Sequence, residues 1–548
     1  MSPHRTPASL RFASCLLVLP MLSPVAASAE PSLHQRIDTA IAAGQPDFAR
    51  RAAGSASDAE FLRRIYLDLT GVIPTATQAR AFFKDSTPDK RQKLIDQLLA
   101  SPEHARYLAS VLDVMLMERR PDKHVPRAPW LEYLRTSVAA NKPWDQLVRE
   151  MLSSDGADSK QRSAAKFYLD REAEPNLLTR DISRLFLGTN LQCCQCHDHP
   201  RIDDYKQLHY YGLFAFLSRS SIVVDPKVKM AVLSEKADGE VTFQSVFDPA
   251  KVTKHTGPRL PEGPPLKEPA VEKGKEYLIA PVAKGRAVPR FSRRALLGPT
   301  LARGDNEAFR RNIANRLWAL MMGRGLIHPL DMDYSANPPS HPELLAMLAD
   351  DIAARKFDMR GFLRELALSQ TYQRSSELPS GIKEVTPKSY TVALLKPLTP
   401  EQLAWSLLQA TGLTDAERQA LGKKATEAAV YTRVAGSAAP IVKAFASPSG
   451  KAQEFDARLD QALFLANGPT VRGWLTPRAG NLIERLTRLM NPDALAEELY
   501  VSVFTRLPSA EERKEVADFL ASRSTDRAAA LQDMAWALLA SAEFRFNH

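Results

Sequence analysis

The fold is decided by stretches such as Ser57-Asp58-Ala59-Glu60-Phe61-Leu62-Arg63-Arg64-Ile65-Tyr66-Leu67-Asp68-Leu69-Thr70-Gly71. Serine followed three residues later by glutamate is the signature of a capped helix start, and glycine is a typical helix stop. Between them, apolar residues recur three or four positions apart, which places them on one face of a helix. We therefore predict a helix over 57–70 that buries this face in a core.

The same signals recur outward from this stretch. Pro74-Thr75 opens the next expected helix, and Thr87-Pro88-Asp89 caps a third one. Further helical patterns follow in four ranges: 103–118, 128–140, 144–153 and 174–187. Residues 31–218 are therefore predicted to be almost wholly helical.

The composition changes between residues 221 and 290. Short β-rich runs separated by turn residues come first, at 222–224, 228–233 and 241–243. Residues 257–290 are then rich in Pro, Gly and Lys, which is typical of an extended connection. Helical periodicity resumes near residue 305 and continues to the C-terminus. Loops are expected within this last part at 374–390 and 435–453.

These patterns predict a mainly α protein, with two helical domains joined by a small β-rich, extended Pro-Gly-rich insertion. A chain of 548 residues is long enough for about three domains. The expected ranges are a signal peptide at 1–29, a helical domain at 30–219, the insertion and linker at 220–300, and a C-terminal helical domain at 301–548.

The first residues have the form of a secretory signal peptide. A basic start with Arg5 and Arg11 precedes an apolar run over 12–27, and Ala27-Ser28-Ala29 supplies a small-residue cleavage pattern. The apolar run is short for a bilayer span. We therefore predict export to the periplasm or the extracellular space, cleavage near Ala29, and no transmembrane segment in the mature chain.

The charge balance argues against a nucleic-acid partner. The chain has 73 Lys and Arg residues against 63 Asp and Glu residues, a formal net charge of +10. Basic residues alternate with acidic ones and form no long run, whereas nucleic-acid recognition requires a basic face. We expect no nucleic acid as a partner, and the sequence leaves the oligomeric state open.

Three of the four cysteines lie within four residues, the four being Cys15, Cys193, Cys194 and Cys196. Such a set is too small for a disulfide scaffold. The run from Cys193 to His197 contains Cys-x-x-Cys-His, the attachment pattern of c-type haem. Two thiols three residues apart each form a thioether with one haem vinyl group, and the adjacent histidine binds the iron. We predict Cys193 and Cys196 as attachment sites for haem c and His197 as the proximal ligand.

Other uses of this cluster stay open. A non-haem site for Zn or Fe would use two sulfurs and two imidazoles, from Cys193, Cys196, His197 and His199. A disulfide between two of the cysteines would close only a small loop and stabilise little. A redox-active Cys-x-x-Cys is the third alternative, although the expected βαβ surroundings are absent from the sequence pattern. Cys194 is a spare thiol in every case.

The second axial ligand is not identified by the sequence. Met and His are the usual types, and the candidates are His209, Met230, His255, Met321, Met322, His328 and His341. Met321 and Met322 lie in an apolar helical pattern typical of a core, and His341 is expected to cap the helix that follows it. Three carboxylates close to the motif are expected to be solvated, with support of a metal ligand or an acid–base role as the alternatives: Asp198, Asp203 and Asp204. No hydrolase or nucleotide-binding motif occurs, so the sequence leaves open whether the chain is an enzyme.

Two segments of the chain echo each other. Tyr66 and Pro74 keep the same offset as Tyr500 and Pro508, and similar residues lie between them. Similar helix ends follow, at 98–103 and 538–543. The two explanations are an ancient duplicated helical unit and two independent Pro-capped helix pairs.

Specific stretches along nearly the whole mature chain match one family. In the first half they are 63–71, 141–145, 193–200 and 203–216. In the second half they are 315–318, 323–326, 337–345, 465–468 and 541–548. Through these stretches the chain resembles the planctomycete exported proteins that pair a cytochrome-C-like domain of unknown function, number 1549, with a second domain of unknown function, number 1553. The resemblance implies a cytochrome-C-like domain around Cys193–His197, and it implies no particular reaction.

The leading prediction is an exported c-type cytochrome-like redox protein that binds one haem and exchanges electrons with a partner protein in the periplasm. One alternative is a secreted protein with a non-haem Cys/His metal site, such as an enzyme acting on extracellular polymers. The other is a structural envelope protein whose cysteines brace a loop. The haem prediction requires an apolar cleft beside Cys193–His197, of about 300–1,000 Å³.

Overall fold

The computed structural model describes residues 1–4, 31–226, 229–283, 285–447, 458–523 and 526–548. The signal peptide expected at 1–29 therefore falls almost entirely outside the described residues. Leu33–His548 form one compact unit. Of the helices that the structure describes, none combines the length and apolar character needed to cross a membrane.

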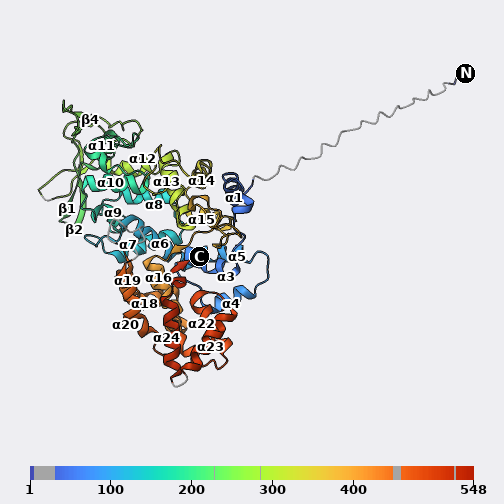
Figure 1. Cartoon of the computed structure of the whole chain (residues 1–548). Coiled ribbons are helices and arrows are strands. Elements are labelled where there is room, and N and C mark those ends of the chain that lie inside the picture. Colours follow the sequence, from blue (N-terminus) through green and yellow to red (C-terminus); the bar gives the residue numbers. More distant parts are fainter. Residues whose placement is uncertain (5–30, 227–228, 284, 448–457, 524–525) are drawn as a thin grey trace. The chain divides into compact units, whose positions relative to one another are not determined.

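The unit Leu33–His548 is built mainly of helices (Figure 1), as predicted. Its first part holds α1 (Leu33–Ala43), α2 (Phe48–Arg51), α3 (Asp58–Thr70), α4 (Ala76–Lys84), α5 (Lys90–Leu99), α6 (Pro102–Met117), α7 (Arg127–Ala139), α8 (Trp144–Ser153), η1 (Arg162–Ala165), α9 (Lys166–Leu169), α10 (Pro175–Phe186), η2 (Gln192–Gln195) and α11 (Gln207–Leu217). Its later part holds α12 (Arg293–Leu301), α13 (Glu307–Met322), α14 (Pro342–Ala354), α15 (Met359–Leu368), η3 (Pro387–Ser389), α16 (Pro400–Ala410), α17 (Leu413–Leu421), η4 (Gly422–Lys424), α18 (Glu427–Phe445), α19 (Leu459–Asn467), α20 (Pro469–Trp474), α21 (Leu482–Thr487), α22 (Pro492–Phe504), α23 (Ala510–Ser522), α24 (Arg527–Ala540) and α25 (Ala542–Arg545).

The strands form small antiparallel pairs, and most of them lie between the helical parts. The pairs are β1 (Ser220–Asp225) with β2 (Met230–Glu235), β3 (Val241–Phe243) with β4 (Lys254–Thr256), β5 (Tyr277–Ile279) with β6 (Val288–Pro289), and β7 (Lys396–Pro397) with β8 (Phe546–Asn547). The last pair joins the C-terminal residues to a segment that lies far away in the sequence. The predicted β-rich insertion between helical regions is therefore confirmed.

The helix signals at Ser57 and Gly71 act as predicted, whereas Asp89 occupies the N-cap position of α5 without a side-chain hydrogen bond. The helix expected over 57–70 is α3, and the Ser57 hydroxyl accepts a hydrogen bond from the Glu60 amide at 3.2 Å. Gly71 ends the helix with a left-handed φ of 72°. A Cβ atom at this position would lie 2.2 Å from the Tyr107 ring, so both the backbone and the packing require glycine here.

The loop expected at 435–453 is wrong over its first part, because α18 runs without a break to Phe445, and residues 448–453 lie outside the described residues. Pro440 lies inside this helix. The buried side chains of Val434, Ala438 and Ile441 recur at helical spacing and belong to a hydrophobic cluster that also contains residues of α16. Burial of this face outweighs the local helix-breaking signal.

The buried apolar side chains form two clusters that cross the expected domain ranges. The first cluster extends from Leu33 to Tyr390 and adds Val501. The second cluster is formed by residues of 398–544 together with Leu67 and Ile73. Helix α3 therefore contributes to both clusters, since its Phe61 lies in the first and its Leu67 in the second. The boundaries of the sequence domains stay a prediction.

Asp68 on α3 lies at the centre of a buried polar network. Its carboxylate accepts hydrogen bonds from Lys396 Nζ at 2.6 Å, from the Tyr372 hydroxyl at 2.9 Å and from Asn547 Nδ2 at 2.8 Å. Burial raises the pKa of Asp68 and lowers the pKa of Lys396, while each charge favours the ionised form of the other. The network joins α3, the segment before α16 and the C-terminus.

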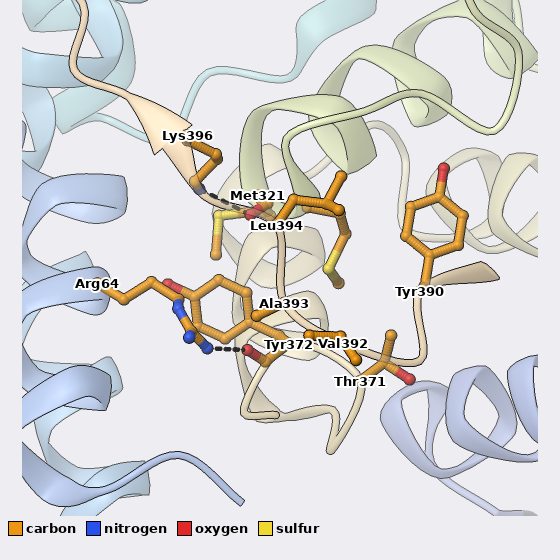
Figure 2. Close-up of a pocket in the computed structure, with 10 residues that line it drawn as sticks. Arg64, Met321, Thr371, Tyr372, Tyr390, Val392, Ala393, Leu394 and Lys396 are labelled. Carbon is orange, nitrogen blue, oxygen red and sulfur yellow. Dashed lines mark hydrogen bonds between the residues drawn. The ribbon is translucent and has the colours of Figure 1, made fainter. Parts of the chain in front are cut away.

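A small cavity lies beside this network, and Figure 2 shows its lining. In this view Lys396 donates to the Met321 carbonyl at 2.9 Å, and Arg64 donates to the Tyr372 carbonyl at 2.7 Å. The cavity holds about 20 Å³, which is room for about one water molecule. We therefore interpret this region as a structural junction.

The two echoing segments share their local geometry as well as their sequence. Gly71 and Thr505 end α3 and α22 with left-handed φ values of 72° and 62°. Thr75 and Ser509 then each form a capping box with the residue three positions later. The two segments therefore share the same arrangement of helix end, turn and helix start. An origin by duplication stays a prediction.

His104 makes the stability of the fold sensitive to acid. Its ring is buried, its Nδ1 lies 2.8 Å from the Leu69 carbonyl oxygen, and burial lowers its pKa to about 4. The unfolded chain binds this proton near pH 6.5, whereas the folded chain binds it only near pH 4. The contribution to stability is therefore complete above about pH 6.5 and is lost as the pH falls toward 4, by about 3 kcal/mol.

This expectation is tested by urea unfolding at a series of pH values. His104→Gln should flatten the decrease in unfolding free energy between pH 6.5 and 4, because glutamine does not titrate. His255→Gln is the matched control, since His255 lies exposed on β4. An equal pH dependence in both variants would show that His104 is not the group responsible.

Candidate functional site

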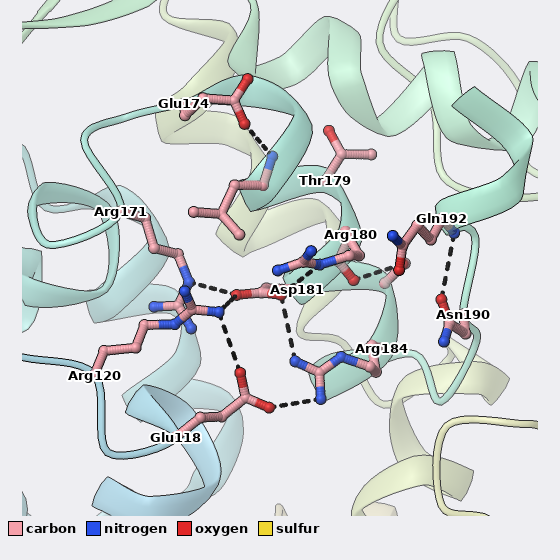
Figure 3. A network of polar contacts seen from close by, with 12 residues as sticks. Glu118, Arg120, Arg171, Glu174, Thr179, Arg180, Asp181, Arg184, Asn190 and Gln192 are labelled. Carbon is pink, nitrogen blue, oxygen red and sulfur yellow. Dashed lines mark hydrogen bonds and ion pairs between the residues drawn. The ribbon is translucent and has the colours of Figure 1, made fainter. Parts of the chain in front are cut away.

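Helix α10 carries the chain into the loop that holds the cysteine cluster. Asp181 on this helix is fully buried, and its carboxylate pairs with Arg171 Nε at 2.7 Å and with Arg120 at 3.0 Å. Figure 3 shows Arg180, Arg184 and Glu118 completing the network. Burial opposes ionisation, but the surrounding guanidinium charges dominate and lower the pKa of Asp181 to about 2. The network fixes α10 to the end of α6 and so positions the start of the loop.

The 3₁₀ helix η2 decides which cysteines face the solvent. The Cys194 amide donates to the Leu191 carbonyl at 2.9 Å, and the Cys196 amide donates to the Cys193 carbonyl at 3.3 Å. With three residues per turn, positions 193 and 196 share one face and position 194 points elsewhere. Cys193 and Cys196 are accordingly exposed, Cys194 is buried, and all three are free thiols.

Cys194 belongs to the core. Its side chain is fully buried within the first hydrophobic cluster. Burial raises the pKa of the Cys194 thiol to about 12, so the thiol is not ionised at neutral pH. The spare cysteine of the motif therefore packs as a small apolar residue.

His197 follows the two exposed cysteines, and one of its ring nitrogens is hydrogen-bonded. Its Nδ1 lies 2.6 Å from the Asp198 carbonyl oxygen, a contact that requires a hydrogen on Nδ1. In the neutral ring, Nε2 is then unprotonated, which is the form that binds a metal. One side of the ring packs on Phe247, with 4.5 Å between ring centroids and an interplanar angle of 37°.

The loop is tied to the helix that follows it. The Asp198 carboxylate accepts a hydrogen bond from the Gln207 amide at 2.7 Å, at the start of α11. The Gln195 carbonyl accepts one from the Tyr211 hydroxyl at 2.9 Å. Tyr211 in turn stacks on Phe243 of β3, with 4.6 Å between ring centroids. These contacts fix the conformation of the surface loop that carries the motif.

His199 is directed toward its own loop. Its Nδ1 accepts hydrogen bonds from the amides of Arg201 at 3.2 Å and Ile202 at 3.0 Å. Among the residues that the structure describes, no group of three or more His, Cys, Asp or Glu side chains is arranged to hold a metal ion. The four ligands of the alternative site, Cys193, Cys196, His197 and His199, are thus not gathered into such a group.

The end of the loop contacts the segment after α13. The Asp204 carboxylate accepts hydrogen bonds from the Ser335 amide at 2.5 Å and the Ser335 hydroxyl at 2.8 Å. The Tyr205 hydroxyl donates to the Asp333 carbonyl at 3.1 Å. Asp203, by contrast, is exposed, as expected of a solvated loop carboxylate. The motif is thereby connected to the second half of the chain.

The candidates for the second axial ligand lie on several different elements. Met321 and Met322 are buried in α13, as expected of core residues. His341 occupies the N-cap position of α14, as expected, but its side chain makes no capping hydrogen bond. The His341 ring instead packs near Tyr390 and its Nδ1 lies 3.2 Å from the Ser340 hydroxyl. The other candidates lie on α11 (His209), β2 (Met230), β4 (His255) and the segment after α13 (His328).

The apolar surface beside the motif comes from a loop that the sequence analysis missed. Neither the small cavity beside Asp68 nor a second cavity of about 300 Å³, lined by residues such as Arg120, Lys123 and Glu174, includes the motif, so neither is the apolar cleft that the haem prediction requires. The Val246 amide, in the loop between β3 and β4, donates to the Cys196 carbonyl at 3.0 Å. Val246 and Phe247 are both exposed there. Two adjacent large apolar residues in a turn-rich stretch were the available sequence signal.

Comparison with known families gives two matches. Residues 36–221 match the family PSCyt2, described as "Protein of unknown function (DUF1549)". Residues 293–520 match the family PSD1, described as "Protein of unknown function (DUF1553)". The cysteine loop lies within the first match, and the segment that contacts its end lies within the second. No curated protein and no solved structure matches the chain.

Proposed function

The chain belongs to the proteins that join a DUF1549 domain to a DUF1553 domain, and on that premise we propose that it is an exported c-type redox protein. It holds one haem covalently through Cys193 and Cys196, with His197 as the proximal ligand. The observation that carries this proposal is the geometry of η2. It presents two free thiols on one exposed face, beside a histidine whose Nδ1 is engaged.

The residues of the motif fit the chemistry of attachment. Each thiol adds across one vinyl C=C bond, so that a carbon–sulfur bond forms and the thiol hydrogen moves to the neighbouring carbon. No oxidant is consumed, and two free thiols meet the requirement. A c-type haem, once bound, supplies one-electron transfer. The hydrogen bond from His197 Nδ1 to the Asp198 carbonyl fixes the ring tautomer and leaves Nε2 for the iron.

The expected signal peptide supports the same proposal, because covalent haem attachment takes place outside the cytoplasm. The proposed partner is a redox protein of the periplasm. The exposed position of Cys193 and Cys196 favours electron transfer to this partner, since a haem attached there would lie at the surface and within reach of it.

The proposal is tested with the full chain, expressed with its own leader in a host that matures c-type cytochromes. The purified protein is extracted with acid–acetone and its absorption spectrum is recorded. We expect a Soret band that stays with the protein and an intact mass increased by one haem. A colourless protein after extraction would overturn the proposal, and stoichiometric Zn or Fe without porphyrin would favour the non-haem site.

A further inference from the structure

We infer that the loop of residues 245–253, between β3 and β4, is the apolar wall of the haem site, and that Phe247 is the residue that positions His197. This inference rests on the proposed function. The loop lies far from the motif in the sequence, and it touches the motif twice. Its chemistry matches one occupant, a flat apolar macrocycle held at Cys193, Cys196 and His197.

The first observation is the contact between two rings. Phe247 lies against the His197 imidazole with 4.5 Å between ring centroids, yet 72 % of Phe247 stays exposed. An aromatic ring packed on the imidazole restricts its rotation. Together with the hydrogen bond from Nδ1 to the Asp198 carbonyl, this contact fixes the direction in which His197 Nε2 points.

The second observation is the exposure of the neighbouring apolar side chains. Val246 is 66 % exposed and Val252 is 52 % exposed. Large apolar side chains grouped on one short loop mark a surface that binds another apolar group. Because Phe247 contacts the proximal histidine itself, the group to be covered is the one that His197 holds.

The third observation is that the loop is held in shape. The Val246 amide donates to the Cys196 carbonyl at 3.0 Å, which ties the loop to the attachment motif. The Asp248 carboxylate accepts hydrogen bonds from the amides of Ala250 at 3.0 Å and Val252 at 3.2 Å. Gln244 Nε2 donates to the Thr253 hydroxyl at 2.6 Å and closes the base of the loop. These hydrogen bonds together hold the loop in one defined conformation against the motif.

The test compares Phe247→Ala with Phe247→Leu in the haem-loaded full chain. Loss of the apolar wall exposes the iron to water, which favours the more highly charged oxidised state. We expect Phe247→Ala to keep its covalent haem and to show a reduction equilibrium constant about tenfold lower, a decrease of about 59 mV in midpoint potential. Phe247→Leu should restore most of this change.

The matched controls are Leu278→Ala and Val282→Ala, whose side chains are 62 % and 68 % exposed on or beside β5. Their potentials should equal that of the wild type. An unchanged potential in loaded Phe247→Ala would overturn this inference and leave the proposed function standing. If the potential were unchanged but electron transfer to a partner slowed, the loop would be a protein-docking surface, which also overturns it. Absence of haem from the wild type would instead overturn the proposed function.

Discussion

Replacing both Cys193 and Cys196 by serine is expected to abolish covalent retention of haem. A serine hydroxyl does not replace a thiol in addition to a vinyl group, so neither thioether forms. Both side chains are exposed, and such substitutions change stability by about 0.5 kcal/mol or less. The loss should therefore occur in a folded protein. Acid–acetone extraction followed by intact mass measurement separates covalent from non-covalent haem.

The single variants and Cys194→Ala make this result specific. Cys193→Ser or Cys196→Ser alone should retain haem through one thioether, with a shifted haemochrome band because one vinyl group stays conjugated. Cys194→Ala is the neighbouring control, expected to keep both thioethers while losing about 1 kcal/mol of stability from the core. Covalent haem in the double variant, or its loss from folded Cys194→Ala, would contradict the assignment.

Much of the helical fold was predictable because its signals are local. Ser57 and Gly71 delimit α3 through hydrogen bonds and a backbone conformation that involve only nearby residues. The continuation of α18 through Pro440 was not predictable in this way. The apolar spacing of Val434, Ala438 and Ile441 is present in the sequence, but Pro440 signals a helix break within it. The helix continues because this face is buried in a cluster shared with α16, which is a property of the tertiary structure.

The candidate site was also predictable only in part. Cys-x-x-Cys-His is visible in the sequence, and its spacing of three already matches one turn of the 3₁₀ helix that exposes Cys193 and Cys196. The contact between His197 and Phe247 was not visible, because it depends on how the β3–β4 loop folds back onto the motif. Pairing across such separations is set by tertiary structure, which no periodicity in the sequence encodes.

Of the substitutions proposed, Asp68→Ala is expected to lower the free energy of unfolding most, by about 3–5 kcal/mol. It breaks a buried ion pair and leaves one charge without its partner. The Lys396 side chain is only 16 % exposed and would lose the carboxylate that lies 2.6 Å from its ammonium group. The Tyr372 hydroxyl and Asn547 Nδ2 would lose the same acceptor. The free energy of unfolding, measured by chemical denaturation and circular dichroism, gives the loss directly.

The expected loss of stability depends on the burial of the ion pair, so an exposed ion pair of the same chain serves as the control. Lys514 and Asp518 also lie 2.6 Å apart, but their side chains are 76 % and 66 % exposed. Asp518→Ala should therefore lower the free energy of unfolding by no more than about 0.5 kcal/mol. Lys396→Met combined with Asp68→Ala should recover part of the loss, because it removes the charge left without a partner. If Asp68→Ala and Asp518→Ala destabilised the protein equally, the buried network around α3 would not be what holds the C-terminus in place.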